Sequence, residues 1–197
     1  MERRKALKQT AIAAGSVALT PALFSLLQSC QQQTRLEWEP QFLNHQQASF
    51  ISSMVDTILP KTDTPGGLEV KVDIFIDKVF AEIYDQEQQT AVVREIEQFD
   101  QKCREQFGDS FAKLNDKERT EVLKNAESTA GKFNGKVWGT AVGTQQPVGF
   151  YRNLKSMILW GYFTSAEIGK NVLNYDPVPG AYLGCIPLSE VGNIWSL

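Results

Sequence analysis

The segment VDIFIDKVFAEI, residues 72–83, gives the strongest indication of the fold class of this chain. Its apolar side chains recur every three or four positions: Val72, Phe75, Ile76, Val79, Phe80 and Ile83. Because an α-helix turns once every 3.6 residues, this spacing places them on one broad face. The segment therefore predicts an amphipathic helix that packs against the rest of a helical domain.

Helical spacing also marks the segments on either side. Asn44 and Gln47 have the spacing of a capping box, and Pro60 stops the helix that they open. A third helix is expected from about Gln86 to Phe107. Its apolar stripe consists of Val92, Ile96, Phe99, Cys103 and Phe107. Charged residues fill the other faces of that helix, as in a helix that lies on a core.

A shorter helix is expected next, followed by a segment whose structure the sequence leaves open. Asn115 and Glu118 form another capping-box pattern, and Val122 and Leu123 are expected to point inward. Residues 128–146 are rich in Gly, Thr, Ser and Gln, and form either a loop or a short helix with a loose end. Glycines recur there at positions 131, 135, 139 and 143, without the strand-then-helix context of a phosphate-binding loop.

The last helical signals follow Pro147. A largely buried helix is indicated by the spacing of Phe150, Tyr151, Leu154, Met157, Ile158 and Tyr162. Thr164 and Glu167 have the spacing of one more capping box, which would open a short helix through Leu173. The aromatic cluster Trp160, Tyr162 and Phe163 is interpreted as core or interface.

The C-terminal segment Asn174–Pro187 differs from the rest. It contains three prolines and two glycines, so a regular helix is excluded there. Its apolar side chains would be costly to leave in water, so the segment is expected to lie across an apolar surface of its own domain or of a partner. The chain thus reads as all-α, with one domain of about five to seven helices over residues 42–197 and a long irregular C-terminal tail.

The first 29 residues are interpreted as an export signal. Arg3 and Arg4 form a twin-arginine pair, and residues 9–27 are apolar but interrupted by a proline and small polar side chains. Ser29 and Cys30 resemble a lipobox, which predicts cleavage after Ser29 and lipidation of Cys30. Residues 30–41 would then be the lipidated cysteine and its tether. The alternative is a cytoplasmic amphipathic helix with an incidental cysteine.

Composition excludes several classes of protein. The full chain has 197 residues and a net charge of -3. Removing the signal lowers the basic and acidic counts from 20 and 23 to 16 and 22, which leaves a charge of -6. An acidic domain of this kind is not expected to bind nucleic acid. A single histidine and three scattered cysteines exclude a His-rich or four-cysteine metal site.

The remaining reactive side chains have simple structural explanations. His45 is interpreted as a solvated neighbour of a helix cap, and the acidic pairs Glu95–Glu97 and Asp63–Asp73 as charged surface rather than acid–base couples. Cys103 lies on an apolar stripe and is most simply a buried small hydrophobe. In an exported protein it could instead pair with Cys185. No catalytic, cofactor-binding or metal-binding residue is predicted.

Several motifs together resemble a known family. These are Gly161–Ser165, Asn174–Gly180 and Gly184–Pro187 near the C-terminus, and Ile58–Pro60 with Asp63–Gly66 earlier. With the twin-arginine start, they are similar to the small subunit, or subunit 3, of gluconate 2-dehydrogenase. The resemblance spans essentially the whole chain after the signal, and its most specific part is Gly161–Pro187.

The resemblance implies an accessory role. Small subunits of that family associate with a large glucose–methanol–choline-type flavoprotein and often with a multihaem cytochrome c, so FAD and haem would lie in partner subunits. The small subunit carries the export signal for the twin-arginine translocase and has no assigned catalytic residue. A lipidated Cys30 would add a membrane anchor that not every member has.

The leading hypothesis is therefore a lipid-anchored protein on the periplasmic side of the envelope that binds, exports and anchors a sugar, polyol or gluconate dehydrogenase. The residues expected to contact the partner are Tyr162, Phe163, Tyr175, Tyr182 and Ile186. One rival is a stand-alone lipoprotein that binds a sugar or another envelope protein. Another is an independent enzyme that uses Asp63, Asp176 or Tyr175.

Overall fold

The computed structural model describes residues 38–133, 136–137, 140–141, 143–144, 147–178, 180 and 185–196. The residues predicted to act in export, lipidation or partner binding that lie outside these ranges are Arg3, Arg4, Cys30 and Tyr182. Residues 38 to 196 belong to one compact unit.

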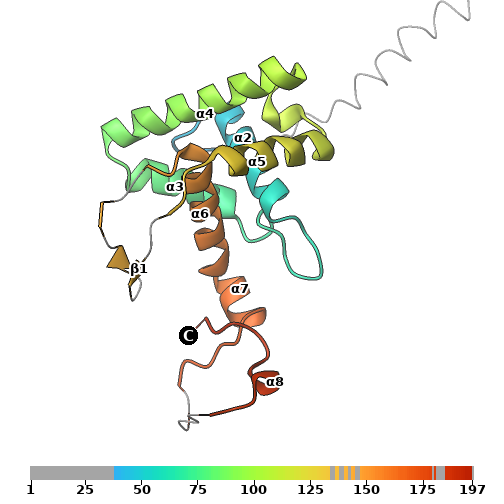
Figure 1. The fold of residues 1–197 in the computed structure, drawn as a ribbon, viewed down its shortest axis with the longest axis vertical. Helices are drawn as coiled ribbons and strands as arrows, with labels where there is room; N and C mark the ends of the chain where they lie inside the picture. The colour runs from blue at the N-terminus through green and yellow to red at the C-terminus, as the bar shows by residue number, and fades with distance from the viewer. Residues whose placement is uncertain are drawn as a thin grey trace, which may run out of the picture. The chain divides into compact units, whose positions relative to one another are not determined.

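Helices dominate the described residues, which confirms the all-α prediction. They are α2 (His45–Ile58), α3 (Val72–Glu82), α4 (Gln86–Phe107), α5 (Asp116–Thr129), α6 (Phe150–Phe163), α7 (Ala166–Asn171) and α8 (Leu188–Val191), with a 3-10 turn, η1 (Phe111–Lys113). Two two-residue strands, β1 (Lys136–Val137) and β2 (Thr140–Ala141), pair in antiparallel register. Figure 1 shows α6 followed by α7 on the way to the C-terminal residues. None of the described helices is both long enough and apolar enough to cross a membrane.

Helices α2 and α5 start at the side-chain caps that the sequence predicted. The Asn44 side chain accepts a hydrogen bond from the backbone N–H of Gln47, and the Gln47 side chain accepts one from the N–H of Asn44. The same reciprocal pair joins Asn115 and Glu118 at the start of α5. Each cap satisfies backbone donors that the first turn of a helix leaves unpaired, which fixes where the helix begins.

Three details differ from the sequence prediction. The cap of α7 is Ser165, whose hydroxyl accepts from the N–H of Ile168, while Thr164 closes α6 and donates its hydroxyl to the Trp160 carbonyl. Helix α7 ends at Asn171 rather than continuing through Leu173. Ile83 lies beyond the last residue of α3 and is 73% exposed, so it does not belong to the buried face.

Residues 128–146 were expected to be a loop or a short helix with a loose end. Among the described residues of this segment, helix α5 continues to Thr129 and the two-residue strands β1 and β2 pair with each other.

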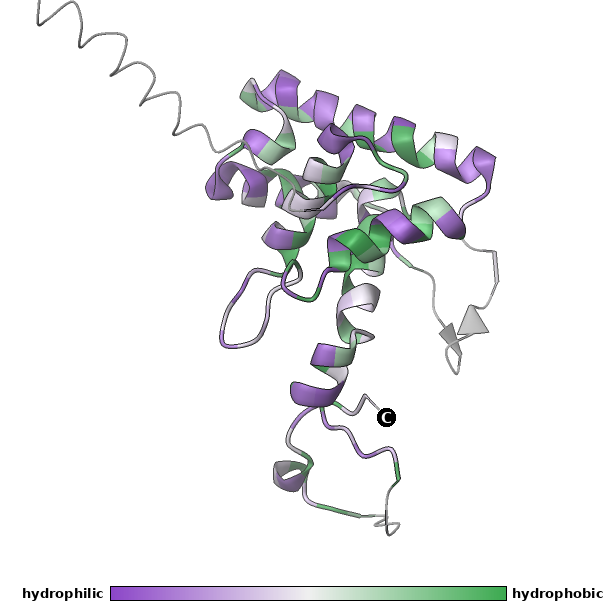
Figure 2. Cartoon of the chain, turned by 180° about the vertical axis from the view of Figure 1, so that it is seen from behind, coloured by the Kyte–Doolittle hydropathy of each residue, from purple (hydrophilic) through white to green (hydrophobic). Residues whose placement is uncertain are grey.

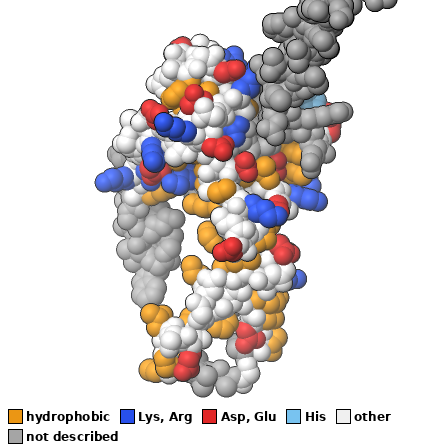
Figure 3. Space-filling view, turned by 90° about the vertical axis from the view of Figure 1, so that its right-hand side faces the viewer, with side chains coloured by type: hydrophobic (Ala, Val, Ile, Leu, Met, Phe, Trp, Pro, Cys, Tyr) orange, Lys and Arg blue, Asp and Glu red, His pale blue; other side chains and the backbone are white. Residues whose placement is uncertain are grey.

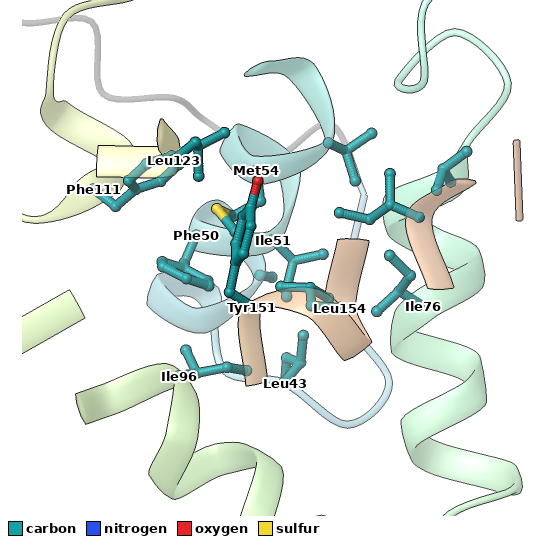
Figure 4. Close-up of a cluster of buried hydrophobic side chains, with 14 of the residues drawn as sticks. Leu43, Phe50, Ile51, Met54, Ile76, Ile96, Phe111, Leu123, Tyr151 and Leu154 are labelled. Carbon is teal, nitrogen blue, oxygen red and sulfur yellow. The ribbon is translucent and has the colours of Figure 1, made fainter. Parts of the chain in front are cut away.

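Helix α2 lies at the centre of the core. Apolar side chains of α2 meet those of the other helices, as Figure 4 shows for Ile51 and Met54 beside Leu154 and Tyr151 of α6. Aromatic rings extend the core, with the Phe50 ring centroid 5.6 Å from those of both Phe99 and Phe111. Figure 2 shows that α4 is mainly hydrophilic along its length with apolar residues at intervals, as expected of a helix that covers a core.

The segment before α2, residues 38–43, is held on α3 by two buried carboxylates. We call it the N-terminal strap. Asp77 accepts hydrogen bonds from the backbone N–H groups of Gln41 at 2.6 Å and Leu43 at 2.8 Å. Asp73 accepts from the Trp38 indole N–H at 3.1 Å. Buried carboxylates are stable where several donors satisfy them, so the strap and these aspartates depend on each other.

Candidate partner-binding surface

The C-terminal half of α6 lies close against α3. Gly161 makes this approach possible, because a Cβ atom at this position would lie 2.8 Å from Cδ1 of Phe75. That separation is shorter than a van der Waals contact, so a larger residue would force either the Phe75 ring or the helix to move. Gly161 is therefore explained by helix packing.

Tyr162 belongs to the interior. Only 7% of its surface is exposed, and its hydroxyl donates a 2.7 Å hydrogen bond to the carbonyl oxygen of Pro65. The sequence prediction had placed this side chain on the partner. Its ring and hydroxyl are instead occupied within the chain, because Gly161 lets α6 come near enough for Tyr162 to reach the loop after α2.

That loop, residues 60–71, is closed by its own hydrogen bonds. The Glu69 carboxylate accepts from the backbone N–H of Gly66 at 2.9 Å and pairs with the Lys61 ammonium. These contacts, that with Lys61 first, lower the pKa of Glu69. A Cβ on Gly67 would lie 2.6 Å from Cγ1 of Val55, so this glycine lets the loop return to α2. The segment Asp63–Gly66, on which the family resemblance partly rests, is thus explained by closure of this loop.

Two aromatic side chains of α6 lie on the outer surface. Trp160 is exposed, with its ring centroid 5.4 Å from that of Phe75. Phe163 is also exposed and packs edge-to-face on Tyr162 at 5.5 Å. Both rings are fixed by a neighbour on one side and open to solvent on the other. Rigid aromatic rings of this kind are common at protein interfaces.

The chain after α7 folds back, so that Ser196 near the C-terminus contacts Gly169 of α7. We call its described parts, residues 172–178 and 185–196, the C-terminal loop. Asn174 and Trp195 form a β-bridge, in which the N–H of Asn174 donates to the Ile194 carbonyl at 2.9 Å. The Asn193 side chain donates to the Val172 carbonyl at 2.8 Å, and the Ser196 hydroxyl to the Gly169 carbonyl at 2.7 Å. Polar groups therefore hold the ends of this loop together.

Val172 and Leu173 pack against the core, whereas the large apolar side chains farther along the C-terminal loop are exposed. Its large exposed members are Tyr175, Val178, Ile186, Leu188, Ile194 and Trp195. Figure 3 shows hydrophobic side chains on the surface of the lower part of the molecule, where α7 and the C-terminal loop lie. Tyr175 and Ile186 were expected to be partner contacts, and the structure leaves both accessible. The sequence did not single out Leu188, Ile194 and Trp195, which are exposed as well, because no helical or strand periodicity marks them.

The C-terminal part of the sequence has acidic side chains but no basic ones. Residues 171–197 contain two acidic residues, Asp176 and Glu190, and no lysine, arginine or histidine. The C-terminal loop is therefore an apolar and weakly acidic surface.

The two cysteines of the domain are both free thiols. Cys103 is buried beside a cavity of about 400 Å³ between α4, α5 and the start of α6, whereas Cys185 is exposed in the C-terminal loop. Burial, with a smaller contribution from the Asp100 carboxylate, raises the pKa of Cys103 to about 12. The structure thus supports the small-hydrophobe interpretation of Cys103 and not the Cys103–Cys185 disulfide.

Other candidate residues do not come together as a reactive site. Asp73 is buried on α3, where it accepts from Trp38 of the strap, while Asp63 is exposed in its loop, so these two do not form a carboxylate pair. His45 is exposed at the start of α2, with Nε2 3.5 Å from a Glu39 oxygen. Among the residues that the structure describes, no three His, Cys, Asp or Glu side chains gather as metal ligands.

The fold and this surface define a small helical protein whose most prominent feature is an exposed apolar face suited to another protein. The chain belongs to the gluconate 2-dehydrogenase subunit 3 family, whose model matches residues 45–180. The match covers α2 to α7 and the first part of the C-terminal loop. Members are subunits of a multi-subunit gluconate dehydrogenase complex. Comparisons with curated proteins and with solved structures gave no match.

Proposed function

We propose that this chain is the accessory, non-catalytic subunit of a membrane-associated, FAD-dependent dehydrogenase that oxidises gluconate, another sugar acid, a sugar or a polyol. In this proposal the large subunit, of the glucose–methanol–choline type, holds FAD, and a cytochrome c subunit, where the complex has one, holds haem. The observation that carries the proposal is the family match over residues 45–180, in a chain that begins with a twin-arginine pair.

The first task of the chain is export. The twin-arginine translocase moves folded proteins, so a signal at Arg3 and Arg4 can carry a bound flavoprotein that has no signal of its own. The flavoprotein crosses only while it stays bound, which requires a stable interface of standard size or larger. The exposed aromatic and aliphatic side chains of α6 and the C-terminal loop provide apolar surface for such an interface.

The second task is attachment. Lipidation at Cys30 would place several acyl chains on the chain, and each buried methylene contributes about 0.8 kcal/mol to membrane binding. Trp38, where the N-terminal strap begins, is eight residues after Cys30. An extended chain of eight residues spans at most about 28 Å, so the anchor would hold the domain near the membrane surface.

Two variants of the full chain separate export from attachment. With Arg3→Lys/Arg4→Lys, we expect the flavin-dependent dehydrogenase activity to stay in the cytoplasm. With Cys30→Ser, we expect activity to reach the periplasm but to be released in soluble form. Activity is measured in cytoplasmic, soluble periplasmic and membrane fractions.

Gln33→Ser is the control for Cys30→Ser, because it introduces the same side chain into the same tether and keeps the Cys30 thiol. It is expected to leave the distribution of activity unchanged. Normal export of the flavoprotein in the double-lysine variant would contradict the export role. Unchanged membrane retention in Cys30→Ser would contradict the anchoring role.

A further inference from the structure

The C-terminal loop combines internally bonded polar side chains with exposed apolar ones. The bonded polar side chains are those of Asn174, Asn193 and Ser196, and that of Asn174 donates to the carbonyl oxygens of Val191 and, at 2.7 Å, of Asn193. Its large apolar groups are outside, with Trp195 52%, Ile194 69% and Leu188 87% exposed. Ordinary surface loops show polar groups to water, so this arrangement indicates a surface that another molecule covers.

We propose that the C-terminal loop is a preformed docking element for the large subunit of the dehydrogenase complex, with Trp195, Ile194 and Leu188 as its main contacts. This inference rests on the proposed function, since it names the surface through which that function is carried out. The complementary surface on the large subunit is an apolar groove with a neutral or basic rim.

The charge of this segment distinguishes a protein partner from a lipid surface. Peripheral membrane binding usually combines apolar insertion with lysine or arginine residues that face anionic lipid headgroups. Residues 171–197 carry two acidic residues and no basic ones, so an anionic surface would repel them. The same acidic character disfavours a second copy of this loop as the partner, because like charges would then meet.

The hydrogen bonds at the base of the loop make the surface ready to bind. The Asn193 side chain donates to the carbonyl oxygen of Val172. Ser196 donates through its backbone N–H to the Asn174 carbonyl at 2.9 Å, and through its hydroxyl to the Gly169 carbonyl. A loop fixed in this way loses less conformational entropy when it binds, which raises the affinity. Asn193 therefore acts as a positioning residue, although its side chain need not touch the partner.

The test uses the full chain in its native envelope, together with the flavoprotein that co-purifies with the wild-type chain. A photo-crosslinking amino acid is placed at position 195, and at position 83 as a control. We expect light to join position 195 to the flavoprotein, identified by mass spectrometry and by its flavin absorbance. Ile83 is a suitable control position because it is 73% exposed on another part of the domain.

Affinity measurements with matched variants add a second readout. Ile194→Ser and Ile83→Ser make the same change at sites of similar exposure. We expect Ile194→Ser and Trp195→Ala each to weaken binding of the purified flavoprotein at least about tenfold, and Ile83→Ser to change it less than about twofold. Asn193→Ala is expected to weaken binding while leaving the helical circular dichroism signal unchanged.

The outcomes separate this inference from the proposed function. If the flavoprotein co-purifies but position 195 gives no crosslink to it and Ile194→Ser binds normally, the docking loop is wrong while the accessory role stands. A crosslink from position 195 to lipid or to a second copy of the chain also overturns the docking loop. If no flavoprotein co-purifies with the wild-type chain, both are overturned.

Discussion

The hydroxyl of Tyr162 donates a 2.7 Å hydrogen bond to the carbonyl oxygen of Pro65, although 97 residues separate them in the chain. This bond joins the end of α6 to the loop after α2. Two of the segments on which the family resemblance rests, 63–66 and 161–165, therefore meet in the fold. Both segments are explained by packing, whereas Phe163 and the large apolar side chains of the C-terminal loop are exposed.

Tyr162→Phe tests the contribution of this hydrogen bond. The change removes the donor and keeps the ring, so the Pro65 carbonyl loses its partner while the packing stays the same. We expect the free energy of unfolding to fall by about 1 kcal/mol, the usual net value of one hydrogen bond. Urea unfolding of the full chain in detergent measures it.

Tyr175→Phe is the matched control, because it removes the same hydroxyl from an exposed ring. Its effect on the free energy of unfolding is expected to stay within about 0.5 kcal/mol. Equal effects of the two changes would contradict the assignment of Tyr162 to the interior.

Gly161→Ala tests the close approach of α6 to α3. The new methyl group would lie 2.8 Å from the Phe75 ring, so either the ring or the helix has to move. We expect a loss of about 1–3 kcal/mol in the free energy of unfolding. Gly169→Ala makes the same change in α7, where the nearest atom would be 3.8 Å away. There the better helix propensity of alanine is expected to stabilise by up to about 1 kcal/mol.

Asp77→Ala tests the attachment of the N-terminal strap. Asp77 is 1% exposed, and its carboxylate accepts from the N–H groups of Gln41, Phe42 and Leu43. Without this carboxylate, we expect the free energy of unfolding to fall by about 2–4 kcal/mol and the strap to detach from α3. Hydrogen exchange at the amides of residues 41–43 should accelerate by orders of magnitude, while exchange in α4 changes less. Asp56→Ala, at an exposed position on α2, is the control and should leave strap exchange unchanged.

The sequence predicted the parts of this fold that depend on local spacing. The stripe Val92–Ile96–Cys103 and the caps at Asn44 and Asn115 are signals contained within a few residues, and all are confirmed. The boundary between α6 and α7 was misassigned because Thr164 and Ser165 are adjacent residues that can both cap a helix. Ser165 caps α7 because Thr164 is already the C-terminal cap of α6.

The parts that the sequence could not predict depend on distant partners. A buried aspartate such as Asp77 looks like a surface charge until the strap supplies its donors, 34 to 36 residues earlier. The exposure of Trp195 was equally hidden, because it follows from hydrogen bonds of Asn174 with residues far along the chain. The helical pattern placed Tyr162 on the buried face of its helix, which the structure confirms. The residue was also named as a partner contact because the sequence does not show that its hydroxyl bonds to the distant Pro65 carbonyl.

The two thiols of the domain are expected to differ strongly in reactivity. The pKa of Cys103 is raised from 9.0 to about 12, so at pH 8 its thiolate population falls about a thousandfold. Burial adds a steric barrier. We expect iodoacetamide to modify Cys185 and to leave Cys103 unmodified in the native chain, read by mass spectrometry of the two peptides. After unfolding in guanidinium both should react. Protection of Cys185 that is lost on reduction would contradict the free thiols.

The ion pairs of Glu127 predict a pH dependence of stability. Its carboxylate accepts from Lys155 at 2.8 Å and from Arg152 at 2.6 Å, joining the end of α5 to α6. These contacts, that with Lys155 first, lower the pKa of Glu127 from 4.5. The folded state therefore binds this proton more weakly than the unfolded state. The resulting stability is complete above the unfolded pKa and is lost as the pH falls through the folded pKa.

Glu127→Gln removes this contribution. We expect the variant to unfold at a lower urea concentration than wild type at pH 7, and the difference to shrink as the pH is lowered below about 4. The loss is expected to be smaller at high salt, because both ends of the ion pairs are partly exposed. Glu121→Gln, an exposed position on the same helix, makes the same change away from α6 and should show little dependence on pH. A pH-independent difference for Glu127→Gln would mean that packing rather than charge joins α5 to α6.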